Sequence, residues 1–347
     1  MYNAGIAIRN IREEEFLTQS KPFEKIKFLL RYAVLAPSTH NSQPWLFKIE
    51  PPSCKIYYDP RYSIREADPL QRDLYISFGC FIENLVTAAS YFGVYEHVQY
   101  ICDQNTNLVA EVFFKNLSEV SIVRSGDLLL KPLIDAIKTR VNTRGVFEKK
   151  SIPLDAKDAF KKLNTFDGLE LHLIDDTEKI KALALLTAEG LRVAYRSKKF
   201  REEMSGWINT SFSKRQEGIP GYSLRMPAPI SLIFSSLVRW LDIGKRVGWL
   251  NYQSMASAPL VSIISVERNS PRIWLDVGRL GERMMLIARA RGLKTSIFVA
   301  SVEIGDLYKQ VQTILETSRI PQFLMCVGFL NFDQKPNLRH SVEDKLI

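Results

Sequence analysis

Hydrophobic and polar positions in the first part of the chain follow two periods, one typical of helices and one typical of strands. Apolar residues recur with helical spacing over 23–35 and over 70–92, and Gly93 then stands where a helix C-cap is expected. Shorter runs with strand character lie at 45–49, 55–58, 97–102 and 108–114. This order of elements predicts a complete α+β unit in the first half of the chain.

The second half repeats this mixture of helical and strand patterns. Helices are predicted at 128–141, 156–163, 177–200 and 274–291, and strands at 169–174, 259–266 and 322–329. The pattern is irregular over 204–252, and the breakers Gly-Ile-Pro-Gly at 218–221 and Met-Pro-Ala-Pro at 226–229 lie within it. We interpret 204–252 as an insertion that could act as a lid, with Trp207, Tyr222 and Trp240 as an aromatic wall.

The most apolar run of this insertion is 230–241, ISLIFSSLVRWL. It is shorter than the roughly 20 residues of a membrane-spanning helix, and it contains Arg239. We therefore expect a buried or lid helix, with a helix lying in a membrane interface as the alternative. No membrane span is predicted.

The two long helices resemble each other at a constant offset, which indicates an internal repeat. Gly79, Glu83, Ala89 and Gly93 align with Gly278, Glu282, Ala288 and Gly292. Chance matching of small residues in two amphipathic helices is the alternative interpretation. We interpret the chain as two diverged copies of one unit, residues 1–125 and 126–347.

Composition and charge narrow the class of protein. The chain has 347 residues, of which 46% are hydrophobic and 24% charged, which is ordinary for a globular protein. The net charge of +9 is spread along the sequence without a nucleic-acid-binding motif, so we expect no nucleic-acid partner and a field that attracts anionic small molecules. The four cysteines and four histidines are isolated, which predicts no metal site and reduced thiols. With no apolar leader at the N-terminus, we expect a cytoplasmic protein.

The stretch with the clearest chemical character is Ala-Pro-Ser-Thr-His-Asn-Ser-Gln-Pro-Trp at 36–45. Two prolines bracket short side chains that carry hydroxyl and amide groups, which indicates an ordered loop suited to a polar, uncharged ligand edge. A helix end followed by a simple turn is the alternative.

This string resembles the flavin-contacting loop of the FMN-dependent nitroreductase family, and in particular its Acg-type branch, in which two nitroreductase-like halves are fused. The resemblance implies an α+β, nitroreductase-like fold whose two halves pack as an intrachain pseudo-dimer, with one FMN at their junction. It also implies that FMN contacts Pro37, Ser38, Thr39, Asn41 and Gln43.

A second stretch, Arg140-Val141-Asn142-Thr143-Arg144, places two arginines around a short amide. Arginine suits forked contacts with phosphate, although a solvated helix end would have the same composition. In nitroreductases a segment of the form Arg-x-Ser-x-Arg/Lys holds the FMN phosphate, and Arg140, Asn142 and Arg144 look like its counterpart. Because the first half has this motif in no clear form and the second half lacks the 36–45 loop, we expect one composite site per chain.

Two further regions complete the predicted site by resemblance. The segment 292–305 is similar to the family segment near the flavin N5, which implies roles for Ser301, Glu303 and Ile304, although glycine is common in relatives where Ile304 stands. An acid that caps the helix beginning near Asp306 is the alternative for Glu303. Family members often have a phosphate-binding arginine after the last strand, and Arg339 is the candidate substitute.

No nucleophile and base are paired in the sequence, so we predict no catalytic side chain and assign the chemistry to the flavin. The expected activity is ping-pong hydride transfer from NADH or NADPH, through the flavin N5, to a small-molecule acceptor such as a nitroaromatic or a quinone. One alternative is a flavin-binding or storage protein with a sealed site and little turnover. Another is a specialised dehydrogenase acting on a peptide or biosynthetic intermediate. Either a monomer or a homodimer is compatible with fusion.

Overall fold

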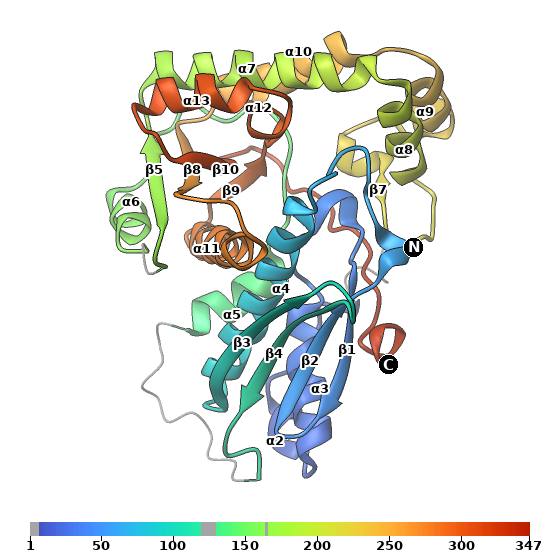
Figure 1. The fold of residues 1–347 in the computed structure, drawn as a ribbon, viewed down its shortest axis with the longest axis vertical. Helices are drawn as coiled ribbons and strands as arrows, with labels where there is room; N and C mark the ends of the chain where they lie inside the picture. The colour runs from blue at the N-terminus through green and yellow to red at the C-terminus, as the bar shows by residue number, and fades with distance from the viewer. Residues whose placement is uncertain (1–6, 119–129, 164–165) are drawn as a thin grey trace.

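The computed structural model describes residues 7–118, 130–163 and 166–347. Two antiparallel sheets lie on opposite sides of a pair of long helices, and further helices cover the outer side of the second sheet (Figure 1). The first half comprises α2 (Glu14–Thr18), α3 (Pro22–Ala33), β1 (Trp45–Glu50), β2 (Ser53–Tyr58), α4 (Arg72–Tyr91), β3 (Tyr95–Asp103) and β4 (Leu108–Phe114).

The second half is longer because several helices separate the first two strands of its four-stranded sheet, β5 and β8. It comprises α5 (Lys131–Thr139), α6 (Leu154–Lys161), β5 (Leu169–Ile174), α7 (Thr177–Arg196), α8 (Lys198–Trp207), β6 (Ile208–Asn209), β7 (Ile219–Pro220), α9 (Ala228–Trp240), α10 (Gly244–Ala256), β8 (Leu260–Val266), α11 (Pro271–Ala290), β9 (Lys294–Ile297), α12 (Ala300–Glu303), α13 (Leu307–Leu315) and β10 (Ile320–Gly328).

The two sheets have the same topology. Their strand orders are β1-β2-β4-β3 and β5-β8-β10-β9, and every neighbouring pair is antiparallel. In each half the long helix, α4 or α11, follows the second of these strands in the chain. The α+β class that the sequence predicts is therefore present in the structure, which contains two sheets of the same strand order.

The helices α4 and α11 cross at the two glycines that the sequence offset aligns. A Cβ added to Gly79 would lie 2.1 Å from the carbonyl oxygen of Leu275, and one added to Gly278 would lie 2.0 Å from that of Ile76. Ile76 and Leu275 are related by the same offset as the glycines. The absence of both side chains lets the two backbones touch, which joins the halves closely.

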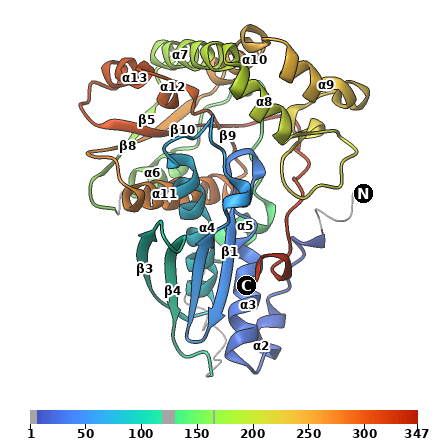
Figure 2. The same cartoon turned by 45° about the vertical axis from the view of Figure 1, so that its right-hand side comes forward.

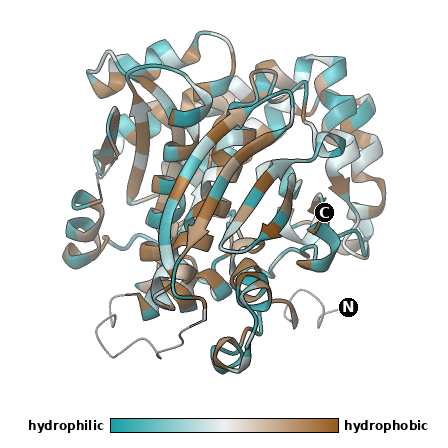
Figure 3. Cartoon of the chain, turned by 60° about the horizontal axis from the view of Figure 1, so that its bottom comes forward, coloured by the Kyte–Doolittle hydropathy of each residue, from teal (hydrophilic) through white to brown (hydrophobic). Residues whose placement is uncertain are grey.

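The two sheets differ in how they are buried, and their sequences explain why. Strand β1 alternates buried and more exposed positions, as expected when only one face packs on a core. Strand β10 is buried almost throughout: Phe323, Met325 and Val327 face the central core, whereas Leu324 and Cys326 face a second core under α7 and α13. Figure 3 shows hydrophobic and hydrophilic segments mixed along the strands of the first sheet.

The C-terminal segment 329–347 returns from the second half to the first and ends beside β1 (Figure 2). Leu346 forms a parallel bridge to Phe47, and the Lys345 ammonium donates to the carbonyl oxygen of Gln43 at 2.9 Å. The end of the second half therefore holds the loop that follows α3.

Several predicted elements need correction. The helix predicted over 177–200 stops at Arg196, because Ser197 is extended and its Oγ accepts from the amide of Phe200, which starts α8. The segment 204–252 is more helical than its pattern indicates, because it contains the end of α8, all of α9 and most of α10, and both breakers lie between the end of α8 and the first turn of α9. The boundary at 125/126 and the start of the helix predicted at 128 lie outside the described residues. Among the residues that the structure describes, no helix is long and apolar enough to cross a bilayer.

Candidate functional site

A cavity of about 230 Å³ lies at the junction of the two halves. Its wall contains most of the residues that the sequence predicts to bind a cofactor: Pro37, Ser38, Thr39, Asn41, Arg140, Asn142, Arg144 and Arg339. The first four come from the loop after α3, the next three from the segment after α5, and the last from the C-terminal segment. Residues far apart in the sequence are thus brought to one place.

The loop after α3 is held in a conformation that presents polar groups. His40, Asn41 and Gln43 have φ of 53°, 57° and 51°, a left-handed region that asparagine tolerates best of the three. The Ser38 Oγ accepts from the Gln43 amide at 2.9 Å. The Thr39 amide donates to the Ser77 Oγ of α4 at 3.2 Å. These contacts fix the loop against its own half.

Asn41 joins this loop to the rest of the wall. Its Nδ2 donates to the carbonyl oxygens of Gln216 and Leu338, at 2.9 and 3.3 Å, and its Oδ1 accepts from Arg339. Gln43 is fully buried and does not line the cavity. Its Nε2 donates to the Gln216 oxygen at 2.8 Å and its Oε1 accepts from the His340 amide at 2.8 Å. Gln43 therefore braces the loop from behind.

Arginine side chains supply most of the charge in the wall. The Arg140 Nε donates to Glu282 Oε1 at 3.1 Å and its Nη2 to the Leu35 carbonyl at 3.1 Å, so that guanidinium is already largely engaged. Arg144 donates to Asn251 Oδ1 at 3.1 Å, and its guanidinium lies 5.9 Å from the Phe298 ring centroid. Arg339 donates to Asn41 and to the Ala36 carbonyl.

Sequence reasoning missed Arg9, which lines the cavity and donates to the backbone oxygens of Lys138 and Arg140, each at 3.1 Å. Burial and the Arg140 charge lower the pKa of Arg9 to about 10. Burial, followed by repulsion from Arg9 and Arg140, lowers the pKa of Arg339 well below its usual range. Because like charges crowd here, an anion in this cavity would be stabilised.

Two of these arginines also carry unsatisfied donors. The Nε atoms of Arg9 and Arg339 are buried, and neither has a hydrogen-bond partner in the described part of the chain. Two further residues of the wall have such atoms. The Asn337 Oδ1 and the His40 Nε2 are buried, and among the described residues neither has a hydrogen-bond partner. Since buried polar groups are normally paired, this wall has the character of a binding site.

The segment 292–305 reaches the cavity by a different part than the sequence predicts. Ile297 and Val299 line it, and the Ile297 amide donates to the Asn142 Oδ1 at 3.2 Å. Ser301 is buried and its Oγ accepts from Thr187 at 3.2 Å. Glu303 and Ile304 lie beyond Ser301 and are not part of the lining.

Glu303 instead belongs to an ionic cluster at the start of α4. The Arg72 Nη2 donates to Glu303 at 2.7 Å and to Asp73 at 3.0 Å, and Asp73 lines the cavity. Burial and the neighbouring Asp73 raise the pKa of Glu303 well above its usual value. Burial opposes ionisation of Asp73 too, but Arg72 holds its pKa below the usual range. Glu303 does not act as a cap for the helix that follows.

His40 and the α4 residues Ile76, Ser77 and Cys80 also line the cavity. Burial lowers the pKa of His40 to about 4, so this imidazole is neutral at physiological pH. The helical period places Asp73, Ile76, Ser77 and Cys80 on one face of α4, which is the signal that could have found them. It could not have shown that this face meets the loop.

A larger hollow, of about 930 Å³, adjoins this cavity and shares Arg9, Arg140 and Val141 with it. Two of its basic side chains are already paired, because Lys138 contacts Glu13 at 3.3 Å and Lys294 contacts Asp333. We therefore assign the polar recognition site to the smaller cavity, with the larger hollow as additional room.

Part of the predicted insertion closes one side of the cavity. Ile219 and Ser223 line it, and the Tyr222 hydroxyl donates to the Pro336 carbonyl at 3.3 Å. The Gly218 amide donates to the Asn41 carbonyl at 3.3 Å. This segment is therefore bonded to the loop that it covers.

Comparisons with known proteins give a short sequence match to two proteins and distant similarity to several solved structures. No protein-family profile matches the chain. Two proteins of Mycobacterium tuberculosis, named "Putative NAD(P)H nitroreductase MT3217" and "Putative NAD(P)H nitroreductase Rv3131", are each 36% identical over 70 residues, 20% of this chain. The match spans only about a fifth of the length of these curated relatives, 20%.

Among solved structures, the FMN-dependent nitroreductase NfnB of Mycobacterium smegmatis in complex with NADPH is 18% identical, with 58% of this chain and 89% of that chain covered and a TM-score of 0.38. NfnB from a Sphigopyxis strain, described as FMN- and NADPH-dependent, is 14% identical, with 61% and 96% covered and a TM-score of 0.40. A nitroreductase with bound FMN from Desulfitobacterium hafniense is 13% identical, with 62% and 97% covered and a TM-score of 0.38.

Proposed function

We propose that this protein is an FMN-dependent NAD(P)H oxidoreductase of the nitroreductase family, from the Acg-type branch with two fused halves. The observation that carries the proposal is the composite cavity. Its wall joins a Pro-Ser-Thr-His-Asn loop from one half to an Arg-x-Asn-x-Arg segment from the other. The short similarity to two proteins named as nitroreductases supports the same assignment.

The chemistry of the wall fits FMN. Arg144 and Arg339 would hold the phosphate, since arginine forks match phosphate oxygens and both side chains face the cavity. Ser38, Thr39 and Asn41 would contact the polar edge of the flavin. The cavity alone is slightly below the range of about 300–1,000 Å³ that ligand sites occupy, and the adjoining hollow supplies the remaining space.

When bound, FMN would accept a hydride from NADH or NADPH and pass electrons to an oxidised small molecule, such as a nitroaromatic or a quinone, in a ping-pong order. The chain's own contribution is binding and exclusion of water. Ile76, Ile297 and Val299 give an apolar wall, and the loop after α3 is fixed before any ligand arrives. We assign no catalytic side chain. We further propose a cytoplasmic monomer or homodimer, because one chain supplies the whole site.

A second candidate is a flavin-binding or storage protein with little turnover. The contacts that favour it are those of the covering segment, since Gln216 and Gly218 are hydrogen-bonded to the loop residues Asn41 and Gln43. A cover held this firmly would keep nicotinamide from the flavin.

The test is an anaerobic absorbance spectrum of the FMN-loaded protein before and after addition of NADPH. The oxidoreductase predicts bleaching, whereas the storage protein predicts a yellow protein that keeps its colour. The variants Asn41→Ala and Arg144→Ala should each lower FMN occupancy while the folded far-UV spectrum is retained. Full occupancy in both would remove the site assignment.

A further inference from the structure

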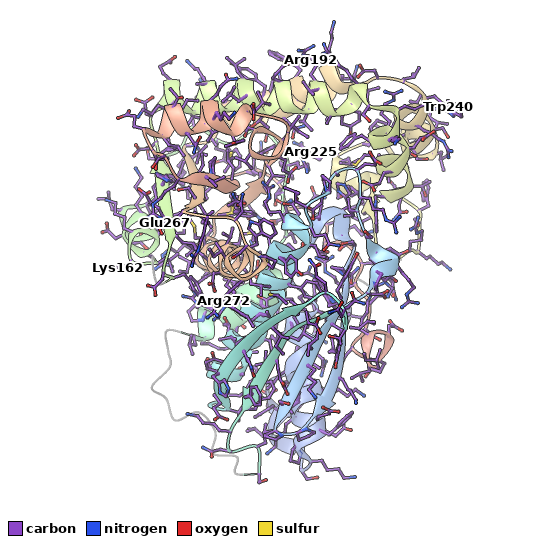
Figure 4. The ribbon with its side chains drawn as sticks, in the orientation of Figure 1. Lys162, Arg192, Arg225, Trp240, Glu267 and Arg272 are labelled. Atoms are coloured by element: carbon purple, nitrogen blue, oxygen red, sulfur yellow. The ribbon has the colours of Figure 1, made fainter. Side chains whose placement is uncertain are left out.

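The outward face of α9 is apolar, which is unusual for a helix at the surface of a protein. Only Ser231 and Val238 of this helix are buried. Leu232 and Ile233 are each 57% exposed, and Trp240, at the helix end, is 68% exposed. In Figure 4 Trp240 lies at the outer edge of the molecule. The helix packs through Ser231 and Val238, and its other, largely apolar side has no partner in the part of the chain that the structure describes.

The next helix in the chain, α10, also exposes apolar side chains. Its glycines lie against α7, because a Cβ added to Gly248 would be 2.7 Å from the Ala188 carbonyl oxygen and one added to Gly244 would be 2.9 Å from the Tyr195 Cβ. This close contact turns Trp249 and Leu250 outward, and both are more than half exposed. We call the exposed side chains of these two helices and their link the α9–α10 face: Ile230, Leu232, Ile233, Trp240, Leu241, Trp249 and Leu250.

The charges around the α9–α10 face have one predominant sign. Arg239, Lys245 and Arg246 are exposed, and Asp242 is the one acidic residue between 228 and 256. The Asp242 Oδ1 accepts from the Gly244 amide at 2.9 Å, so it serves the start of α10. The Arg239 guanidinium lies 5.7 Å from the Trp240 ring centroid, which keeps a cation beside an aromatic side chain.

We propose that the α9–α10 face docks on an anionic lipid surface, with its leucine, isoleucine and tryptophan side chains in the interface and its basic residues on the headgroups. Tryptophan is enriched at membrane–water interfaces, and amphipathic helices bind there through apolar area and attraction to anionic lipid. A second copy of the chain is a poorer occupant. A two-fold contact would set Arg239, Lys245 and Arg246 against the same cations.

The buried side of α9 contacts the segment that closes the candidate site. The Ser231 Oγ of α9 accepts from the Ser211 amide at 2.9 Å, and a Cβ added to Gly221 would lie 2.4 Å from the Ser231 Cβ. Ser223, two residues after Gly221, lines the cavity. Docking would thus leave α9 between the covering segment and the lipid. The docking itself does not depend on the proposed activity.

The test is flotation of the full chain with vesicles of phosphatidylcholine alone and of phosphatidylcholine with phosphatidylglycerol. The proposal predicts that the protein floats with the anionic vesicles, and that added salt weakens this binding. Failure to float with the anionic vesicles, or equal binding to both kinds, would overturn the proposal.

Two sets of variants locate the surface. Replacing Arg239, Lys245 and Arg246 together by glutamine should weaken binding roughly a hundredfold, given about a fivefold contribution from each basic residue near a charged membrane. Combining Ile233→Ser with Trp240→Ser should also abolish flotation. The matched control is Leu154→Ser, at a 78% exposed leucine on α6, which should bind as the unaltered chain does.

Equal loss of binding in the control would contradict the assignment. So would a dimer, seen by sedimentation, that the combined serine variant converts to a monomer, because the face would then be a protein interface.

Discussion

Replacing Gly278 by alanine tests the close crossing of the two halves. The new Cβ would lie 2.0 Å from the Ile76 carbonyl oxygen and 2.9 Å from the Gly79 Cα, both on the facing backbone. A carbon and an oxygen in contact need about 3.3 Å, so α4 and α11 would have to separate by about 1 Å. Neither obstacle is a side chain that can rotate away.

The expected cost follows from two opposing effects. Overpacking a well-packed core costs about 1–3 kcal/mol and sometimes more, and backbone obstacles place this case at the upper end. Alanine recovers about 1 kcal/mol through its helix preference. We expect a net loss of about 2 kcal/mol in the free energy of unfolding, measured by urea denaturation followed by circular dichroism.

Gly281→Ala, one turn further along α11, is the matched control. Its Cβ would meet the Phe323 ring at 3.1 Å, and that ring can give way. The helix preference is the same, so the stability should change by less than about 1 kcal/mol. Because the crossing is symmetric, Gly79→Ala should cost as much as Gly278→Ala. Equal stabilities for the Gly278 and Gly281 variants would refute the reasoning.

Three further predictions concern charges. Arg144→Lys keeps the charge but loses the fork, so FMN binding measured by fluorescence quenching should weaken about tenfold; unchanged binding would contradict a phosphate contact. Glu83→Gln removes the buried carboxylate that accepts from Arg279 and Arg283, at 3.0 and 2.6 Å, and should cost about 1.5–3 kcal/mol of stability in urea denaturation. A cost below about 1 kcal/mol would mean that these ion pairs do not stabilise the fold. Burial lowers the pKa of His40 from 6.5 to about 4, so the unfolded chain binds a proton first and stability should fall as the pH drops from 6.5 to 4. His40→Asn should flatten that slope, and a slope that stays the same would show that other groups cause it.

The sequence predicts the fold well where local pattern decides it. The strands at 108–114 and 169–174 are predicted with the bounds that the structure has. The offset pairs Gly79 with Gly278 as equivalent positions of a repeat, and the structure adds that the two helices cross there. Periodicity could not show the break at Ser197, since one serine that caps α8 interrupts an otherwise continuous helical pattern. The helix expected at 230–241 is present as α9, but periodicity could not show that its apolar side faces outward.

Some residues of the candidate site could also be predicted from local sequence, and others could not. The loop at 36–45 and the Arg-x-Asn-x-Arg segment carry local signals, and both contribute to the cavity wall. Arg9 carries none, because its place in the wall depends on tertiary packing of the N-terminal segment. The helical period groups Asp73 with other residues on one face of α4, but it does not show that this face meets the loop. Glu303 and Ile304 are predicted by resemblance alone, and the chain has left the cavity at Val299 and entered α12 before it reaches these positions.

The central claim is that one FMN binds where the two halves meet. The most direct measurement is the amount of FMN retained per chain after loading and gel filtration, for the unaltered protein, Asn41→Ala, Arg144→Ala and the surface control Leu154→Ser. The account predicts one FMN per chain in the unaltered protein and the control, and clear losses in the two cavity variants, whose altered residues come from opposite halves. Full retention in both cavity variants, or no FMN uptake by the unaltered protein, would contradict it.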